Sequence, residues 1–72
     1  MARDICIALG ERIRQLRMDR GWRQIDLAEH AEIHENYVSD LEAGRKEICL
    51  RTLQMVAAAF DMKAADLLSG IG

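Results

Sequence analysis

One short stretch of this sequence carries several hydrogen-bonding side chains and is followed by two cations. Asn36, Ser39 and Asp40 stand at spacings that place them on one side of a helix, and Arg45 and Lys46 come next along the chain. Amide, hydroxyl and carboxylate groups donate and accept hydrogen bonds, and the two cations attract anions. This chemistry indicates a surface that binds a partner.

No group of residues in the sequence is typical of a catalytic or metal site. It contains no pairing of a nucleophile with a base, no glycine-rich phosphate loop and no Cys/His cluster, so we expect neither an enzyme nor a cofactor. His30 and His34 are close in sequence, but the turn expected between them separates the two rings, so we expect no metal. Cys6 and Cys49 indicate free thiols in a reducing compartment.

The stretch from Gln24 to Gly44 is predicted to fold as two short helices joined by a tight turn. Apolar residues recur at helical spacing on one side of each helix, and Ile33 stands between them to fill the gap. They are Leu27, Ala28 and Ala31 in the first helix, residues 24–31, and Val38 and Leu41 in the second, residues 35–43. Gly44 is expected to end the second helix. This outline is a helix-turn-helix, and its second helix carries the polar side chains.

Three further helices complete an all-α, five-helix fold in one domain covering residues 1–72. Asp4 is expected to cap a first helix that ends near residue 20, before Gly21. Helices 50–60 and 64–69 follow the motif. The apolar positions are Ile5, Leu9, Ile13 and Leu16 in the first helix and Leu50, Leu53, Val56, Ala57 and Phe60 in the fourth. Trp22 is expected to pack between the first and second helices, and Met18 to fill a gap in the core or an interface.

The residues expected to precede the later helices are poor caps. None is a Ser, Thr, Asp or Asn, the residue types that cap a helix best. They are Arg23, His34, Cys49 and Lys63. Asp26 and Glu35, which stand early in their helices, are expected to compensate through the helix dipole.

The charges are distributed unevenly along the chain. The net charge is −2, although arginines crowd the first third. These arginines are Arg3, Arg12, Arg14, Arg17, Arg20 and Arg23, and a solvated surface is expected for Arg12 and Arg14. A dipolar surface of this kind binds a polyanion even when the whole molecule is acidic. Since no apolar run approaches the length of a membrane span and no secretion signal is recognisable, we expect a cytoplasmic protein with no membrane partner.

Four segments follow one another at a characteristic spacing: an RIRxLR run, a GWRQxxLA segment, the YVSDLEAG helix and an LxTLxxVAxAF helix. Together they resemble the lambda-repressor-like, or Xre-type, DNA-binding domain over residues 9–68. Within that family, HENYVSDLEAGRKEICLRTL is most similar to the controller proteins of restriction–modification systems, which are small homodimeric regulators. Ile48 stands in the loop where many other relatives have proline.

The resemblance implies that the second helix of the motif enters the major groove of double-stranded DNA and that its early residues meet base edges. The base-reading residues carried over by position are Glu35, Asn36, Tyr37, Ser39 and Asp40. Phosphate contacts are expected from Gln24, Arg17, Arg45 and Lys46. Arg17 is also expected to pair with Glu42 and so to bridge the first helix to the third. For Tyr37 the expectation is a partly buried ring with its hydroxyl near a phosphate.

Three positions depart from the family pattern. Glu32 stands where the turn usually has glycine, so the turn is either left-handed at a cost of about 1 kcal/mol or adopts another form. Glu35 stands where controllers often carry an arginine that reads guanine; a carboxylate either accepts from cytosine or is repelled by phosphate. Ala43 replaces a residue that is basic in some relatives. The reading surface is therefore unusually acidic.

The apolar surface beyond one monomer's needs is concentrated in the last two helices, where we expect a homodimer interface. Its expected residues are Met55, Ala58, Ala59, Leu67, Leu68 and Ile71. Such a dimer places two reading helices about 34 Å apart on one face of the DNA.

The favoured function is a sequence-specific transcriptional regulator on a pseudo-palindromic operator. It would act either by blocking a promoter or by touching RNA polymerase. The acidic reading surface keeps a second class of function open, which is an antitoxin or adaptor-type protein-interaction module with the same fold and weak DNA affinity.

Overall fold

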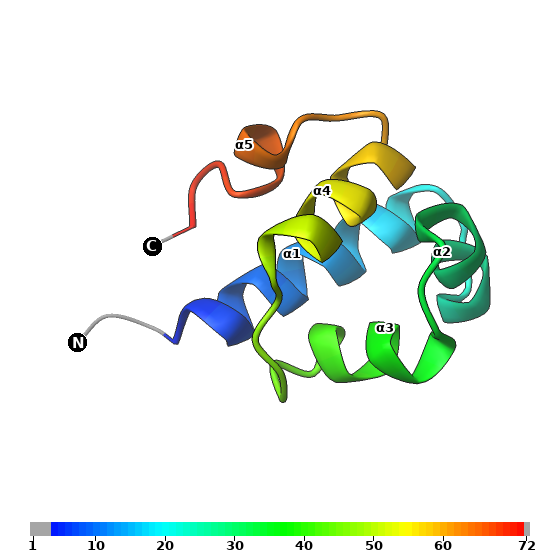
Figure 1. Ribbon diagram of the computed structural model, residues 1–72, viewed down its shortest axis with the longest axis horizontal. Helices are drawn as coiled ribbons and strands as arrows, with labels where there is room; N and C mark the ends of the chain where they lie inside the picture. The colour runs from blue at the N-terminus through cyan, green and yellow to red at the C-terminus, as the bar shows by residue number, and fades with distance from the viewer. Residues whose placement is uncertain (1–3, 72) are drawn as a thin grey trace.

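Asp4 begins the first helix as expected, because its carboxylate accepts the otherwise free backbone N–H groups of Cys6 (2.8 Å) and Ile7 (3.4 Å). The helix, α1 (Ile5–Asp19), is followed by Gly21 at φ +69°, a backbone conformation that glycine adopts without strain. The computed structural model describes residues 4–71 and is shown in Figure 1. The predicted cation Arg3 lies outside the described residues.

Four more helices follow α1, and every regular element within residues 4–71 is a helix. They are α2 (Gln24–Ala31), α3 (Glu35–Glu42), α4 (Leu50–Ala59) and α5 (Ala64–Leu67). The predicted all-α fold is confirmed, and the predicted limits of the third to fifth helices are one or two residues too long. None of the helices within the described residues has the length and apolarity needed to cross a bilayer.

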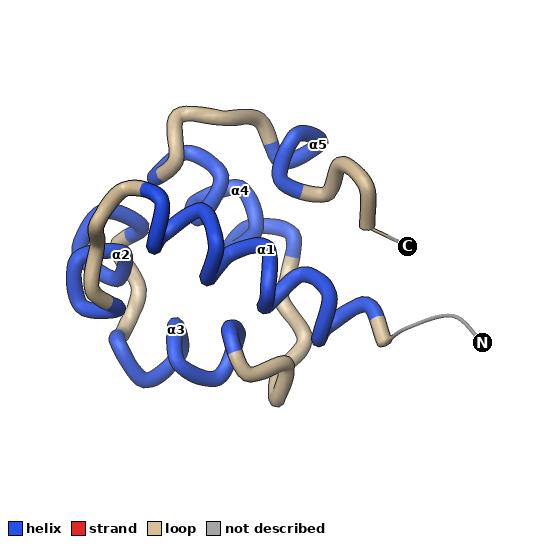
Figure 2. The backbone as a smooth tube through the Cα atoms, turned by 180° about the vertical axis from the view of Figure 1, so that it is seen from behind, coloured by secondary structure: helices blue, strands red, loops and turns tan. Residues whose placement is uncertain are grey.

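The helices are arranged so that α3 and α5 lie on opposite sides of the molecule. In Figures 1 and 2, α1 and α4 occupy the middle, α3 runs along the lower edge and α5 lies at the top. α1 packs on α3, α2 packs on both α3 and α4, and α5 packs on α4. One long surface of α3 therefore remains open to a partner.

The core contains apolar side chains from all five helices. Phe60, Ile13, Leu27, Leu67, Val38 and Val56 are its largest fully buried members. Two sequence predictions of burial are wrong, because Leu50 is 83% exposed and Ile5 56%. Both are the first residues of their helices. Met18, expected in the core or an interface, is 52% exposed in the last turn of α1 and so lies outside the monomer core.

Arg12 of α1 and Arg20, the residue directly after it, attach α1 to backbone carbonyls near the ends of later helices. Arg12 donates from Nε to the Leu67 carbonyl (2.7 Å) and from Nη2 to the Asp66 carbonyl (2.9 Å). Arg20 donates from Nη2 to the Phe60 carbonyl (2.9 Å), with its guanidinium carbon 4.8 Å from the Phe60 ring centroid. The solvated surface predicted for Arg12 is wrong, because its guanidinium is bound to carbonyl groups in the last turn of α5, where carbonyls lack the usual helical partners.

Trp22 packs as predicted, but against different neighbours. Its ring stacks on His30 of α2 at a centroid distance of 4.3 Å and on Phe60, at the end of α4, at 5.7 Å. The side chain therefore joins α2 to α4, whereas packing between the first and second helices was expected.

Two of the weak caps, Arg23 and Lys63, are compensated from inside their helices. Asp26 accepts from the backbone N–H of Arg23 (2.7 Å), and Asp66 accepts from that of Lys63 (3.1 Å). In both helices the third residue thus binds the backbone N–H of the cap residue, which is one half of a capping box. Asp26 therefore compensates for Arg23 through a direct hydrogen bond, whereas the sequence predicts an effect through the helix dipole.

Gly10 allows α1 and α3 to approach closely. It is buried in the middle of α1, and a Cβ atom at this position would overlap the Leu41 carbonyl oxygen and lie 2.7 Å from that of Glu42. Both neighbours are backbone atoms, which cannot move aside as a flexible side chain does. Apolar periodicity does not report this contact, since glycine contributes no side chain to an apolar pattern.

Gly10→Ala is expected to destabilise the fold by about 1–3 kcal/mol, because overpacking forces the two helices apart. Helix propensity alone predicts the opposite, a gain of about 1 kcal/mol from replacing glycine within a helix. Urea unfolding of the two proteins decides between the two effects. A higher unfolding midpoint for the alanine variant would show that the α1–α3 contact is not tight.

Candidate nucleic-acid interface

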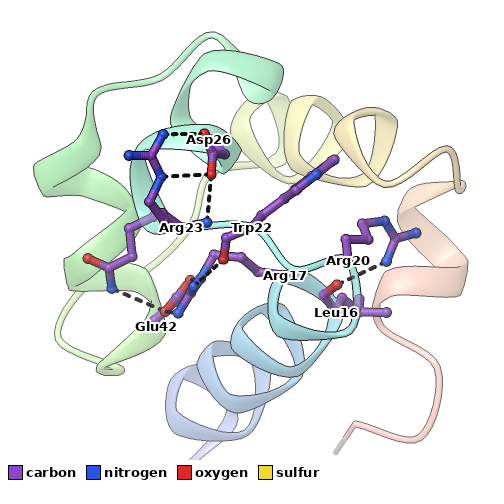
Figure 3. A network of polar contacts seen from close by, with 8 residues as sticks. Leu16, Arg17, Arg20, Trp22, Arg23, Asp26 and Glu42 are labelled. Carbon is purple, nitrogen blue, oxygen red and sulfur yellow. Dashed lines mark hydrogen bonds and ion pairs between the residues drawn. The ribbon is translucent and has the colours of Figure 1, made fainter.

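A buried ion pair fixes α3 relative to α1. Arg17 donates from Nε to Glu42 Oε2 (2.6 Å) and from Nη2 to Glu42 Oε1 (3.0 Å), and the side chains are 12% and 4% exposed. Arg17 Nη1 donates to the Trp22 carbonyl (2.7 Å), as Figure 3 shows. The predicted bridge from the first to the third helix is confirmed. Because all three guanidinium nitrogens of Arg17 donate internally, the phosphate contact also predicted for it remains a secondary proposal.

Gln24 joins the same network from the start of α2. Its Nε2 donates to Glu42 Oε1 at 3.1 Å, so one carboxylate binds both α1 and α2 to α3. The backbone N–H groups of Gln24 and Ile25 make no hydrogen bond within the described residues. Free N–H groups at a helix start, together with the helix dipole, form a favourable site for an anion such as phosphate.

The turn of the motif is left-handed at Glu32, with φ 59° and ψ 41°. The Ile33 N–H donates to the Ala28 carbonyl (3.0 Å), which closes the end of α2 in the way a glycine normally does. Of the two turn forms considered from the sequence, the strained one is present. His34 then starts α3, because its Nδ1 accepts from the Asn36 N–H at 3.0 Å.

The outward surface of α3 carries the predicted base-reading residues at different depths. Glu35 and Asn36 are exposed and make no side-chain hydrogen bond within the described residues. Tyr37, Ser39 and Asp40 are half-buried. The buried side of the helix consists of Val38, Leu41 and Glu42. The first turn of α3 is therefore the part most free to meet a partner.

Asp40 binds the two cations that follow α3. Arg45 Nε lies 3.1 Å from Asp40 Oδ1, and Lys46 Nζ lies 3.4 Å from Oδ2. Lys46 Nζ is also 5.8 Å from the centroid of the Tyr37 ring. The hydrogen bond from Arg45 lowers the pKa of the Asp40 carboxyl, which stays ionised at neutral pH. One predicted base reader thus pairs with two predicted phosphate anchors and offsets part of their positive charge, an arrangement for which the sequence carries no signal.

The residues predicted for the dimer interface divide into two groups. Met55, Ala58 and Ala59 stand at helical spacing on one face of α4, and Ala58 is exposed. Leu67 is wrong as an interface residue, because it is 0% exposed and belongs to the monomer core. The half-buried Leu68 and Ile71 pack against that core and keep part of their surface accessible, so they remain candidates for the interface.

Comparisons with known proteins agree with this geometry. The family described as "Helix-turn-helix domain" matches residues 8–68. The HTH-type transcriptional regulator DdrOP3 of Deinococcus deserti is 46% identical over 63 residues, which are 88% of this chain and 49% of DdrOP3. This chain therefore spans about half the length of that relative.

Two solved structures are similar over most of the chain. The restriction–modification controller protein C.AhdI from Aeromonas hydrophila has a TM-score of 0.83 at 29% identity, over 86% of this chain and 94% of C.AhdI. SinR, a regulator of biofilm formation solved in complex with DNA, has a TM-score of 0.78 at 31% identity, over 85% of this chain and 98% of SinR.

Replacing Glu32 by glycine is expected to stabilise the protein by about 1 kcal/mol, because glycine adopts the left-handed conformation without the clash of a Cβ atom. Glu29→Gly is the matched control, since this exposed residue lies within α2 and its replacement should cost about 1 kcal/mol. Thermal or urea unfolding measures both changes. Two losses of similar size would contradict the strain assigned to the turn.

Proposed function

The chain belongs to the lambda-repressor-like, or Xre-type, helix-turn-helix family, and from this premise we propose that it is a transcriptional regulator that binds duplex DNA sequence-specifically. The observation that carries the proposal is the first turn of α3. Asn36 is exposed there, and its side-chain amide makes no hydrogen bond within the described residues. Glu42 joins this helix to both α1 and α2. A free polar side chain on a rigid helix suits the reading of bases.

In the proposed complex α3 lies in the major groove, with its first residues toward the base edges. The amide of Asn36 has the donor and acceptor needed to pair with adenine. The DNA backbone on the two sides of the groove would be held by Gln24, at the start of α2, and by Arg45 and Lys46, beyond the end of α3. Glu35 lies beside Asn36 and would accept from a cytosine amino group.

Asp40 gives this surface an additional property. In the free protein it binds Arg45 and Lys46, so a phosphate must compete with a carboxylate for these cations. Such competition lowers the affinity for any DNA sequence. The base contacts of α3 then contribute a larger share of the total binding free energy. Asp40 therefore serves selectivity in our proposal, in addition to any base contact of its own.

We further propose that the protein acts as a homodimer on a pseudo-palindromic operator, either blocking a promoter or contacting RNA polymerase. The support is the accessible face of α4, where the small side chains of Ala58 and Ala59 permit a second helix to approach closely. The proposed interface includes this face of α4 and the residues that follow α5. A dimer formed through it leaves both α3 helices free, because α3 lies on the opposite side of the molecule from α5 (Figure 1).

A restriction–modification system is the regulated system we propose, because the alignment with C.AhdI covers nearly that protein's whole length. Genes for an endonuclease and a methyltransferase beside this one would support the assignment. A different neighbourhood, such as a toxin gene, would contradict it.

Selection of bound duplexes from a random pool, followed by a gel shift, tests the proposed function. An enriched sequence with inverted symmetry is expected. If no sequence is enriched even at low salt, the protein is not a sequence-specific DNA-binding regulator.

Two alanine variants should separate base reading from phosphate anchoring. Asn36→Ala is expected to weaken binding to the selected site by roughly 1–3 kcal/mol and to leave nonspecific binding unchanged. Lys46→Ala is expected to weaken binding to all sequences and to lower the salt slope by about 0.9. Titrations of both variants on selected and scrambled duplexes measure these effects. Equal losses on both duplexes for Asn36→Ala would argue against base readout.

Ala58→Glu should abolish the dimer, because a carboxylate at the centre of an apolar contact costs several kcal/mol to desolvate. The fold should be unaffected, since Ala58 is exposed in the monomer. Ala43→Glu, the same change at another exposed alanine beyond the end of α3, is the control and should remain dimeric. Sedimentation at micromolar concentration compares the two. A wild-type monomer, or an Ala58→Glu dimer, would refute this interface.

A further inference from the structure

The arginines between residues 12 and 23 are almost all engaged within the protein. Arg12 and Arg20 hold carbonyls of α5 and of the end of α4, and Arg17 pairs with Glu42. Arg23 pairs with Asp26 at 3.1 Å. Arg14 is the exception, because it is exposed and makes no hydrogen bond or ion pair within the described residues. Its charge is therefore available to a partner.

Arg14 lines a polar cleft between α1, the start of α2 and α3. The cleft has a volume of about 240 Å³. Its lining residues are Arg14, Arg17, Gln24, Ser39, Glu42, Ala43 and Arg45. Three arginines and one carboxylate line the cleft. Arg17 is paired with Glu42 and Arg45 with Asp40, so Arg14 is the lining cation that has no ion-pair partner within the described residues. The cleft is thus locally cationic in a protein whose net charge is −2.

Several hydrogen-bond donors at this cleft have no internal partner. The hydroxyl of Ser39 makes no hydrogen bond within the described residues. Neither does the backbone N–H group of Gln24, the residue that starts α2 and lines the cleft. Donors of this kind around a cation bind the oxygens of a phosphate group.

We propose that this cleft binds one backbone phosphate of duplex DNA, with Arg14 as its principal cation. The proposal rests on the DNA binding proposed above and adds to it a residue for which a solvated surface was expected. The cleft adjoins α3 through Ser39, so a strand bordering the groove that α3 enters passes its mouth. Ser39 then donates its hydroxyl to this phosphate, and base reading is left to the first turn of α3.

Arg14 differs from Arg45 and Lys46 in what it must release. Those two cations leave Asp40 before they meet a phosphate, whereas Arg14 has no ion pair to break. Arg14 therefore makes a contact whose strength is independent of the Asp40 carboxylate. Arg14 also lies on α1, whereas Arg45 and Lys46 lie in the loop after α3. The proposed DNA contact therefore has a cation on each of these two parts of the protein.

Arg14→Gln tests the assignment, with Lys63→Gln as the matched control. Both residues are exposed cations, and Lys63 precedes α5, on the side of the molecule away from α3 (Figure 1). Binding to one selected duplex is titrated between 50 and 200 mM salt. Removing one phosphate contact lowers the salt slope by about 0.9, so over this range Arg14→Gln should lose roughly 3.5-fold less affinity than the wild type. Lys63→Gln should keep the wild-type slope, and Arg14→Lys should restore most of it.

The outcomes separate this assignment from the proposed function. If the wild type binds with a steep salt dependence and Arg14→Gln has the same slope, the cleft holds no phosphate. Equal changes for Arg14→Gln and Lys63→Gln would overturn the assignment as well, because they would reflect net charge alone. A wild type with no duplex affinity at low salt would overturn the proposed function, and the assignment with it. Unfolding midpoints for all variants should equal that of the wild type. A lower midpoint for Arg14→Gln would indicate a structural role for Arg14.

Discussion

The buried pair of Arg17 and Glu42 is the interaction on which the rest of this structure depends. Two charges in a largely dry environment are tolerated only when further hydrogen bonds satisfy them, and here the Trp22 carbonyl and the Gln24 amide do so. Removal of one partner from such a pair typically costs about 3–5 kcal/mol, because the other charge stays buried alone. The pair thus fixes the orientation of α3 against α1 and α2, and the close approach at Gly10 reinforces it.

This constraint explains how an acidic protein presents a surface suited to DNA. Most cations near α3 have internal partners: Arg17 with Glu42, and Arg45 and Lys46 with Asp40. The pairs hold the surface in one arrangement and limit its attraction for phosphate in general. Selective binding then depends more on the hydrogen bonds of the exposed first turn of α3, and less on net charge.

The sequence was sufficient for the features that local rules determine. Apolar periodicity, the Asp4 cap and the glycines at the ends of α1 and α3 located the helices to within two residues, and the family resemblance indicated the Arg17–Glu42 pair. It was insufficient where distant segments meet. The partners of Arg12 and Arg20 lie 40 or more residues away, and no local pattern reports them. For the same reason Leu67 was assigned to an interface, although its neighbours in space bury it completely.

We infer that α3, the start of α2 and the loop after α3 form one continuous DNA-binding surface. Two-dimensional ¹H–¹⁵N NMR of the protein titrated with a selected duplex can locate that surface residue by residue. Large shifts are expected for the backbone amide signals of Gln24, Asn36 and Lys46, and no change for those of Lys63 and its neighbours in α5. Large shifts confined to α4 and α5, with the signals of α3 unmoved, would contradict it.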